Sequence, residues 1–168
     1  MSAYPSPAAV QASDSSLRQF ATVQSLLDFV GQPAVASPAV EISQEMIDQF
    51  ARVTRDSQWI HVDPERASAQ SPYGGTIAHG FLVLSLLTDW QTSCIAFPGA
   101  KMLLNYGFDK VRFTSPVLSG ARVSARFSLA QVVQARPGEA RCAWTVEIEA
   151  EGAPRPSVHA EWLILVRY

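Results

Sequence analysis

The amino-acid sequence predicts an α+β fold, in which an antiparallel sheet wraps around one long buried helix. Two observations lead to this prediction. Residues 77–95 are apolar on nearly every side, and a helix without a polar face is buried over most of its surface. The sequence after residue 121 instead alternates between apolar and polar side chains, a pattern typical of strands with one buried face.

Length and charge limit what the chain can do. Its 168 residues suit a single domain, which we expect to span residues 17–168. Residues 1–16 lack the basic and apolar regions of a signal peptide, so they are predicted to be a disordered tail. The net charge of −2 without a basic run argues against nucleic-acid binding. No apolar run reaches the ~20 residues that span a bilayer, so we expect no membrane partner and a cytoplasmic location.

The cysteines and histidines do not have the spacing of a metal site. Cys94 and Cys142 lie far apart in the sequence and are expected to be two buried, reduced thiols. Together with His61 and His79 they form no zinc-like set of ligands, so we predict no metal and no cofactor.

Two helices and a short strand are expected before residue 56. Apolar residues every three or four positions predict a helix over 17–30, ending at Gly31. A strand interrupted by Pro38 is expected over 35–42. The next helix is expected over 44–55, with Ser43 as its N-cap. Its predicted buried positions are apolar: Met46, Ile47, Phe50, Ala51 and Val53.

Residues 56–75 are rich in polar and turn-forming residues, and we expect them to be mainly non-helical. The exception is a short helix over 64–69, with Asp63 as its N-cap and Pro64 in its first turn.

The last third of the chain predicts an antiparallel meander. Strands are expected over 102–113, 122–129, 141–150 and 158–166, with short turns at 136–139 and 152–156. Only the helix over 77–95 is apolar enough to cover the buried face of this sheet, and that combination is the hotdog architecture. Because exposed sheet edges are usually paired or covered, we expect a homodimer formed through the sheet edge.

The candidate site combines Asp56 and His61, five residues apart, with the later stretch from Gly75 to Gly80. Taken singly, Asp56 is explained as a residue that ends a helix, and His61 as a packed or surface histidine. Together they form a pair suited to general acid–base chemistry, in which the two groups titrate as a unit. If the helix begins near Ala78, the free backbone N–H of Gly80 can bind an oxygen on which negative charge develops.

The pattern Asp56-x-x-x-x-His61-x-Asp63-Pro64, followed by Gly75-Thr-Ile-Ala-His79-Gly80, resembles the motif of MaoC-like dehydratases and (R)-specific enoyl-CoA hydratases. Residues 58–66 and 105–113 are similar to the NodN-like, single-hotdog branch, and the resemblance covers roughly residues 25–168. It implies that Asp56 and His61 are the catalytic pair and hold one water. It also implies that the Gly80 N–H binds the thioester carbonyl.

One departure from the family pattern stands between the two catalytic residues. Many hydratases have Asn-Pro where this chain has Gln58 and Trp59, which puts the shape of the substrate in doubt. Structural roles are expected for the remaining candidates: His79 holds the loop before Gly80, His159 is exposed, and Trp90, Trp144 and Trp162 lie in the core.

The leading hypothesis is an (R)-specific 2-enoyl-CoA hydratase, or 3-hydroxyacyl-CoA dehydratase, acting on an acyl-CoA thioester without a cofactor. Two alternatives remain at this point. One is a hotdog acyl-CoA thioesterase, whose carboxylate activates water against the thioester carbonyl. The other is a non-catalytic protein that binds acyl thioesters.

Overall fold

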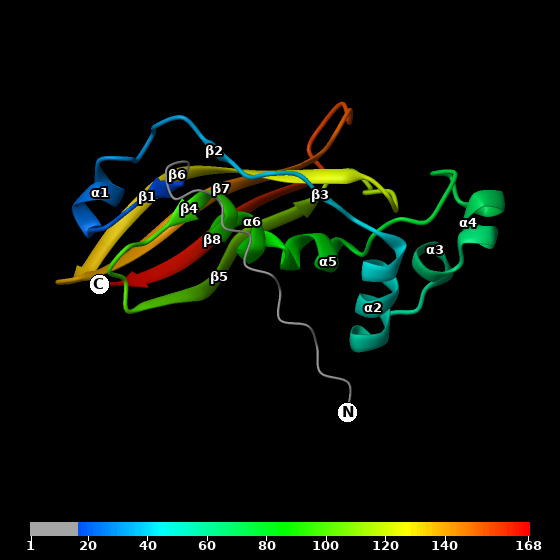
Figure 1. Cartoon of the computed structure of the whole chain (residues 1–168), viewed down its shortest axis with the longest axis horizontal. Coiled ribbons are helices and arrows are strands. Elements are labelled where there is room, and N and C mark those ends of the chain that lie inside the picture. Colours follow the sequence, from blue (N-terminus) through cyan, green and yellow to red (C-terminus); the bar gives the residue numbers. More distant parts are fainter. Residues whose placement is uncertain (1–16) are drawn as a thin grey trace.

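In the computed structural model, which describes residues 17–168, two short helices lie along one face of a six-stranded antiparallel sheet (Figure 1). The predicted disordered tail at 1–16 falls outside the described residues. The strands follow the order β2-β6-β7-β8-β5, with β3 also paired to β6. Their bounds are β2 Val35–Ala36, β3 Val40–Glu41, β5 Met102–Phe113, β6 Arg122–Arg136, β7 Glu139–Ala150 and β8 Val158–Arg167.

The position of β5 differs from a simple meander. β6, β7 and β8 are sequential neighbours as predicted, but β5 pairs with β8 from Met102↔Arg167 to Phe113↔Val158, at the edge opposite β2. After β5 the chain leaves the sheet and contacts the segment before α5, where the Ala78 N–H donates to the Val117 carbonyl at 2.8 Å. The chain thereby passes from β5, at one edge of the sheet, to β6, which lies next to β2 and β3 at the opposite edge.

The single long helix predicted over 77–95 is two helices, α5 Gly80–Ser85 and α6 Leu87–Cys94. They meet at Leu86, whose N–H donates to the Val83 carbonyl at 3.3 Å, a tighter turn than that of an α-helix. The prediction of burial on nearly every side is also wrong, because Phe81 is 67% exposed. The chain after α6 forms β4 Ile95–Ala96, parallel to β1 Arg18–Gln19.

The N-terminal helix is much shorter than predicted. Only α1 Val23–Leu27 is helical, with Thr22 and Ser25 forming a capping box at its start. The preceding residues pair with β4 instead, which places the Phe20 ring in the core beside Phe29 and Trp144. The interrupted strand predicted over 35–42 is confirmed as β2 and β3.

The helix α2 Gln44–Thr54 begins as predicted, since the Ser43 side chain accepts a hydrogen bond from the Met46 N–H at 3.3 Å. Ile47 and Ala51 are buried, but Val53 is 84% exposed, so its predicted burial is wrong. The helix α4 Pro64–Gln70 is confirmed, with the Asp63 carboxylate accepting from the Arg66 N–H.

Buried residues of α5 and α6 join the inner faces of β6, β7 and β8 in one hydrophobic core. Trp90, Trp144 and Trp162 are buried in it, as predicted. Among residues 17–168 both cysteines are free and buried, and burial raises the pKa of Cys94 to about 11 and that of Cys142 to about 12. No helix of the described part of the chain has the length and apolar character needed to span a bilayer.

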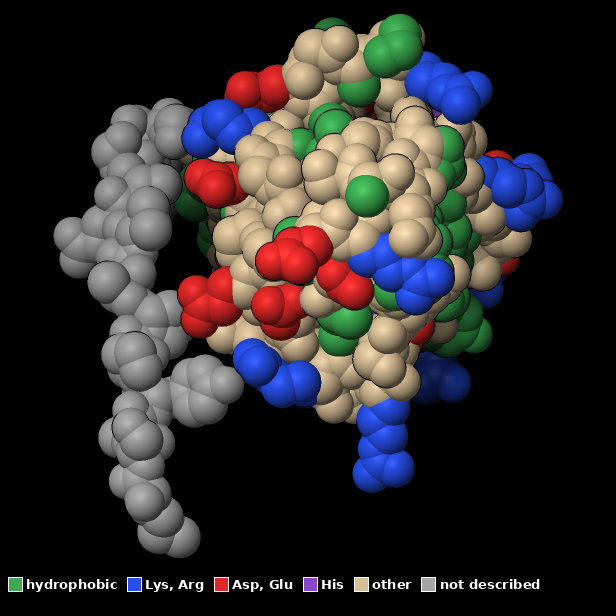
Figure 2. All heavy atoms as spheres, turned by 90° about the vertical axis from the view of Figure 1, so that its right-hand side faces the viewer, with side chains coloured by type: hydrophobic (Ala, Val, Ile, Leu, Met, Phe, Trp, Pro, Cys, Tyr) green, Lys and Arg blue, Asp and Glu red, His purple; other side chains and the backbone are tan. Residues whose placement is uncertain are grey.

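Figure 2 shows the end of the molecule where α3 and α4 lie. On this face several acidic side chains of the described residues lie near one another in the middle, whereas the Lys and Arg side chains lie apart from one another. The separated cations form no basic patch on this face.

Candidate active site

The end of α2 places Asp56. Arg55 is the C-cap of the helix and has φ 62°, the left-handed conformation that turns the chain out of a helix. The Asp56 N–H then donates to the Thr54 hydroxyl at 3.4 Å, and the Asp56 side chain is exposed. The carboxylate therefore stands at the start of the irregular segment that leads to His61.

His61 lies on a one-turn helix, α3 Trp59–Val62, where a non-helical stretch was predicted. Its ring is buried, and Nδ1 lies 2.7 Å from the Ile77 carbonyl oxygen. Because a carbonyl only accepts hydrogen bonds, Nδ1 carries the proton and Nε2 of the neutral ring is an acceptor.

The surroundings of His61 lower its pKa below 6.5. Burial is the main cause, since it disfavours the charged imidazolium. The hydrogen bond to Ile77 opposes this effect, the neighbouring His79 adds to it, and the Asp56 carboxylate opposes it. The ring is therefore predominantly neutral at neutral pH, which is the form that accepts a proton.

His79 links the two predicted catalytic residues. It is buried, its ring stacks on that of His61 with centroids 3.8 Å apart and planes 27° apart, and its Nε2 lies 2.9 Å from the Asp56 main-chain oxygen. Its Nδ1 is buried and has no hydrogen-bond partner among the described residues. These contacts support a structural role for His79 that extends from the loop before Gly80 to Asp56 and His61.

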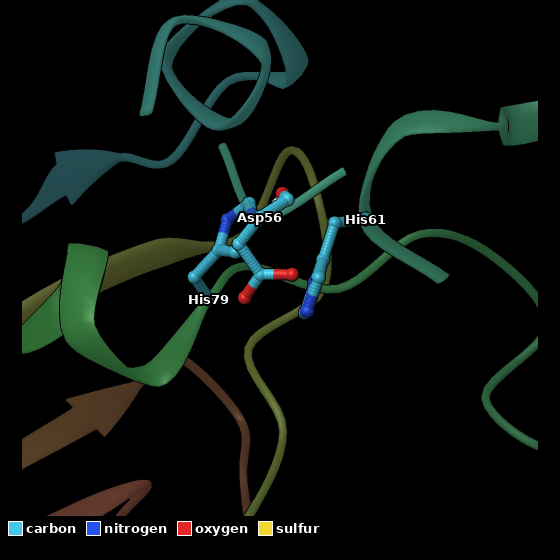
Figure 3. A group of neighbouring side chains, drawn as sticks. All are labelled: Asp56, His61 and His79. Atoms are coloured by element: carbon cyan, nitrogen blue, oxygen red, sulfur yellow. Dashed lines mark hydrogen bonds between the residues drawn. The ribbon is translucent and has the colours of Figure 1, made fainter. Parts of the chain in front are cut away.

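Figure 3 shows the Asp56 carboxylate and the edge of the His61 ring turned toward the same space. One nitrogen or oxygen atom from each of Asp56, His61 and His79 lies within 4.8 Å of the others. A zinc ion would need to lie in the plane of each imidazole, about 2.0–2.1 Å from its nitrogen. The two rings stack at 27°, and Nε2 of His79 is already engaged with the Asp56 main-chain oxygen. The geometry thus suits hydrogen bonding to a water better than a shared metal ion.

Gln44 holds α3 against the loop before α5. Its Nε2 donates to the His61 carbonyl at 2.7 Å, and its Oε1 accepts from the Thr76 hydroxyl at 2.5 Å. The Ile77 N–H donates to the Ile60 carbonyl at 3.1 Å, which adds a second tie between the same segments. No pattern in the sequence singled out Gln44, because its partners lie 17 and 32 residues away.

A cavity of about 500 Å³ opens beside His61. His61 and Gly80 both line it, whereas Asp56 is not among its lining residues and approaches His61 from the side. The rest of the wall combines apolar and hydroxyl-bearing residues with one cation: Tyr73, Ile77, Ala78, Phe81, Val83, Phe113, Thr114, Ser115, Pro116, Val117, Arg155, Ser157 and Val158.

Gly80 is the first residue of α5. The helix was expected to begin near Ala78, and it begins two residues later. The backbone N–H of Gly80 is nevertheless free of hydrogen bonds within the helix. The Val83 N–H donates to the His79 carbonyl in the first turn, so the Gly80 N–H precedes the hydrogen bonds of the helix. With only six residues in α5, the donor role depends on this N–H group more than on a long helix dipole.

An antiparallel sheet packed on central helices, with a carboxylate–imidazole pair beside a cavity, defines a hotdog protein of the hydratase and dehydratase class. The chain belongs to the MaoC-like domain family, whose model matches residues 26–151. The predictions of fold, family and hydratase or dehydratase activity are thereby confirmed at the level of the family, and the activity is that of a hydro-lyase.

Two curated relatives are similar over most of the chain. Nodulation protein N of Rhizobium meliloti (strain 1021) is 44% identical over 140 residues, which cover 83% of this chain and 87% of the relative. The 3-hydroxyacyl-thioester dehydratase Z of Mycobacterium tuberculosis is 43% identical over 152 residues, covering 90% of this chain and 99% of the relative.

A solved structure shows the same arrangement. The R-hydratase PhaJ1 from Pseudomonas aeruginosa, in the unliganded form, superposes with a TM-score of 0.64 at 25% sequence identity. The match covers 82% of this chain and 81% of that one.

Proposed function

We propose that this protein is an (R)-specific 2-enoyl-CoA hydratase, which in reverse is a 3-hydroxyacyl-CoA dehydratase and needs no cofactor. The observation that carries the proposal is His61. It is held neutral with its proton on Nδ1, beside the Asp56 carboxylate and at the wall of a cavity of about 500 Å³. A relative named as a 3-hydroxyacyl-thioester dehydratase supports the choice of an acyl thioester as substrate.

The pair would hold one water next to the C2=C3 double bond of the substrate. The water oxygen forms a bond to C3 while the pair takes one of its protons, and both Nε2 of His61 and the Asp56 carboxylate are able to accept it. The π electrons of the double bond shift toward C2 and the carbonyl. The pair then delivers a proton to C2 and returns to its starting state.

Negative charge develops on the thioester oxygen as C3 is attacked. The Gly80 N–H lines the same cavity as His61 and is the proposed donor to that oxygen. Losing one donor of this kind costs about 10²–10³ in rate in other enzymes. In this proposal the carboxylate and the imidazole activate the water and deliver the proton to C2. The backbone donor stabilises the negative charge on the thioester oxygen.

The test is hydration of trans-2-butenoyl-CoA, with chiral analysis of the 3-hydroxy product. Asp56→Asn and His61→Gln should each lower kcat/KM by about 10²–10⁴-fold, the usual size of a general acid–base contribution. Asp89→Asn and His159→Gln are matched controls, because both residues are exposed, lie on α6 and β8, and do not line the cavity. Full activity in either site variant would contradict the proposed pair.

The same assay separates the alternatives. Release of free CoA from a saturated acyl-CoA, without hydration of the enoyl substrate, would instead identify a thioesterase. Saturable binding without any turnover would identify an acyl-thioester-binding protein.

We also propose a homodimer formed through the edge of the sheet. The outer side of β5 is unpaired among the described residues, and its exposed apolar side chains include Met102, Leu103, Leu104 and Tyr106. Exposed sheet edges are usually paired or covered, and a second copy of the chain would pair this one. Sedimentation equilibrium should show a dimer that Leu103→Lys weakens.

The two free, buried thiols support a cytoplasmic location.

A further inference from the structure

A phenylalanine ring occupies the place where Gly80 lacks a side chain. A Cβ built on Gly80 would lie 2.8 Å from Cδ1, 2.9 Å from Cε1 and 3.0 Å from Cγ of Phe113. Carbon atoms in favourable contact are about 3.5–4.0 Å apart, so any side chain at position 80 collides with this ring. The glycine at the start of α5 is therefore matched to Phe113 as well as to a substrate.

Phe113 belongs to an exposed aromatic pair. It is the last residue of β5 and is 47% exposed, while Phe81 on α5 is 67% exposed. Their rings meet edge to face, with centroids 5.6 Å apart and planes at 75°. This contact stabilises the position of the Phe113 ring over the first turn of α5.

Both rings line the cavity that also contains His61 and Gly80. Isolated exposed hydrophobic residues are ordinary on protein surfaces and need no explanation. Two large rings packed together at the wall of one cavity, beside a backbone donor, form an apolar surface that faces the cavity. The Phe113 ring is thus a wall of the cavity at its Gly80 end.

We propose that Phe113 is a specificity-determining residue, which limits the size of substituents at C2 of the acyl thioester. The inference builds on the proposed function. With the carbonyl oxygen at the Gly80 N–H and C3 next to the Asp56–His61 pair, C2 lies between them, on the side where the Phe113 ring covers Gly80. A methyl branch on C2 meets the ring, whereas an unbranched chain passes it.

The packing half of the proposal is tested without substrate, by thermal unfolding. Gly80→Ala should lower the Tm in the wild-type background, and should lower it by much less in a Phe113→Ala background, because the collision is gone. Gly75→Ala is the matched control, since a Cβ there meets nothing within 4 Å. Equal losses of Tm in the two backgrounds would overturn the proposed match between Gly80 and Phe113.

The specificity half is tested by calorimetric binding of two unreactive ligands, butanoyl-CoA and 2-methylbutanoyl-CoA. Phe113→Ala should shift the ratio of their affinities about 10-fold toward the branched ligand, a change typical of one carbon in an apolar pocket. Phe113→Leu, which keeps the apolar packing, should shift it in the same direction. Leu27→Ala is the control: an exposed apolar residue on α1 that neither lines this cavity nor lies on the β5 edge.

The outcomes separate the inference from the proposed function. An unchanged ratio in both Phe113 variants, with binding intact, would overturn the role of Phe113. Wild-type protein that binds both ligands but does not hydrate trans-2-butenoyl-CoA would overturn the proposed hydratase function. The ratio of the two affinities would still decide the role of Phe113. Failure of the wild type to bind either ligand would overturn both.

Discussion

The sheet and the segment from Gln44 to Gly80 are held together by different interactions. In β6, β7 and β8, every second side chain enters one core, where the rings of Phe127, Trp144 and Trp162 lie against one another. In the segment before α5, single hydrogen bonds such as those of Gln44 and His79 hold residues that are far apart in sequence. Most of the core therefore lies on the sheet, although Ile47 of α2 also belongs to it, whereas the residues of the candidate site are held largely by hydrogen bonds between distant positions. Substitutions in the two regions should separate stability from activity.

Among substitutions that compare the sheet with the segment from Gln44 to Gly80, the largest effect on activity is expected at His61. His61→Phe keeps an aromatic ring to stack on His79 but removes Nε2, so kcat/KM for the enoyl thioester should fall about 10²–10⁴-fold. Unfolding in urea should show a loss of about 1–3 kcal/mol, because the Ile77 carbonyl loses its hydrogen-bond donor while few apolar contacts change. A large loss of stability with modest loss of activity would reverse the assignment of roles between the two regions.

Trp144→Ala should have the opposite profile. The ring is 1% exposed and packs against Phe20 and Phe127, and truncation of such a residue costs about 3–5 kcal/mol of unfolding free energy. Trp59→Ala is the contrasting variant in the site region, where the ring is half-buried and stacks with Arg66 at 4.5 Å. Denaturant unfolding should give a clearly smaller loss for Trp59→Ala.

Gln44→Met should affect both properties to an intermediate degree. Its side chain has a similar volume, but the His61 carbonyl and the Thr76 hydroxyl lose their partner. An unpaired buried polar group costs about 1–3 kcal/mol, and a small displacement of His61 lowers kcat/KM by up to about 10²-fold. Gln49→Met, which removes an exposed hydrogen bond to Glu45 on the same helix, should leave activity unchanged.

Lowering the pH should reduce the stability of the protein through His61, by less than the substitutions described above. Its pKa in the folded protein lies below the unfolded value of 6.5, so the unfolded chain binds more protons once the pH falls to that value. Stability is therefore complete above this pH and decreases as the pH falls, by at most about 1.4 kcal/mol per pH unit. Urea unfolding across this range should show the decrease in wild type and a weaker one in His61→Gln.

The smallest effect is expected at Val53. Because the side chain is 84% exposed, Val53→Ala should change the unfolding free energy by less than about 0.5 kcal/mol. Ile47→Ala, on the buried face of the same helix, should cost about 2–5 kcal/mol. Similar losses in the two variants would mean that α2 packs differently from the structure.

Local patterns in the sequence were sufficient for the parts of the fold that depend on neighbouring residues. The alternation in β6 to β8 and the caps at Ser43 and Asp63 follow from such patterns. The placement of β5 beside β8 does not, because it depends on the path of the chain after Phe113. The break at Leu86 likewise follows from packing, since nothing in the apolar stretch 77–95 marks it.

The candidate site shows the same division. The spacing of Asp56 and His61 and the position of Gly80 were recognisable as a motif, and the structure brings the pair together. The roles of Gln44 and of Phe113 were missed, because each depends on a contact between residues more than 15 positions apart. Contacts of that kind are set by the folded chain and leave no local signature.

The break at Leu86 gives the two halves of one apolar stretch separate tasks. α5 carries Gly80 and Phe81 at the cavity, whereas Leu87, Trp90 and Cys94 of α6 are buried in the core. A continuous helix would transmit a shift of its first turn to every residue that follows. With a joint at Leu86, a substitution at the exposed Phe81 can alter the ligand that is accepted while α6 stays fixed, and the core to which Leu82 and Val83 of α5 also belong is kept.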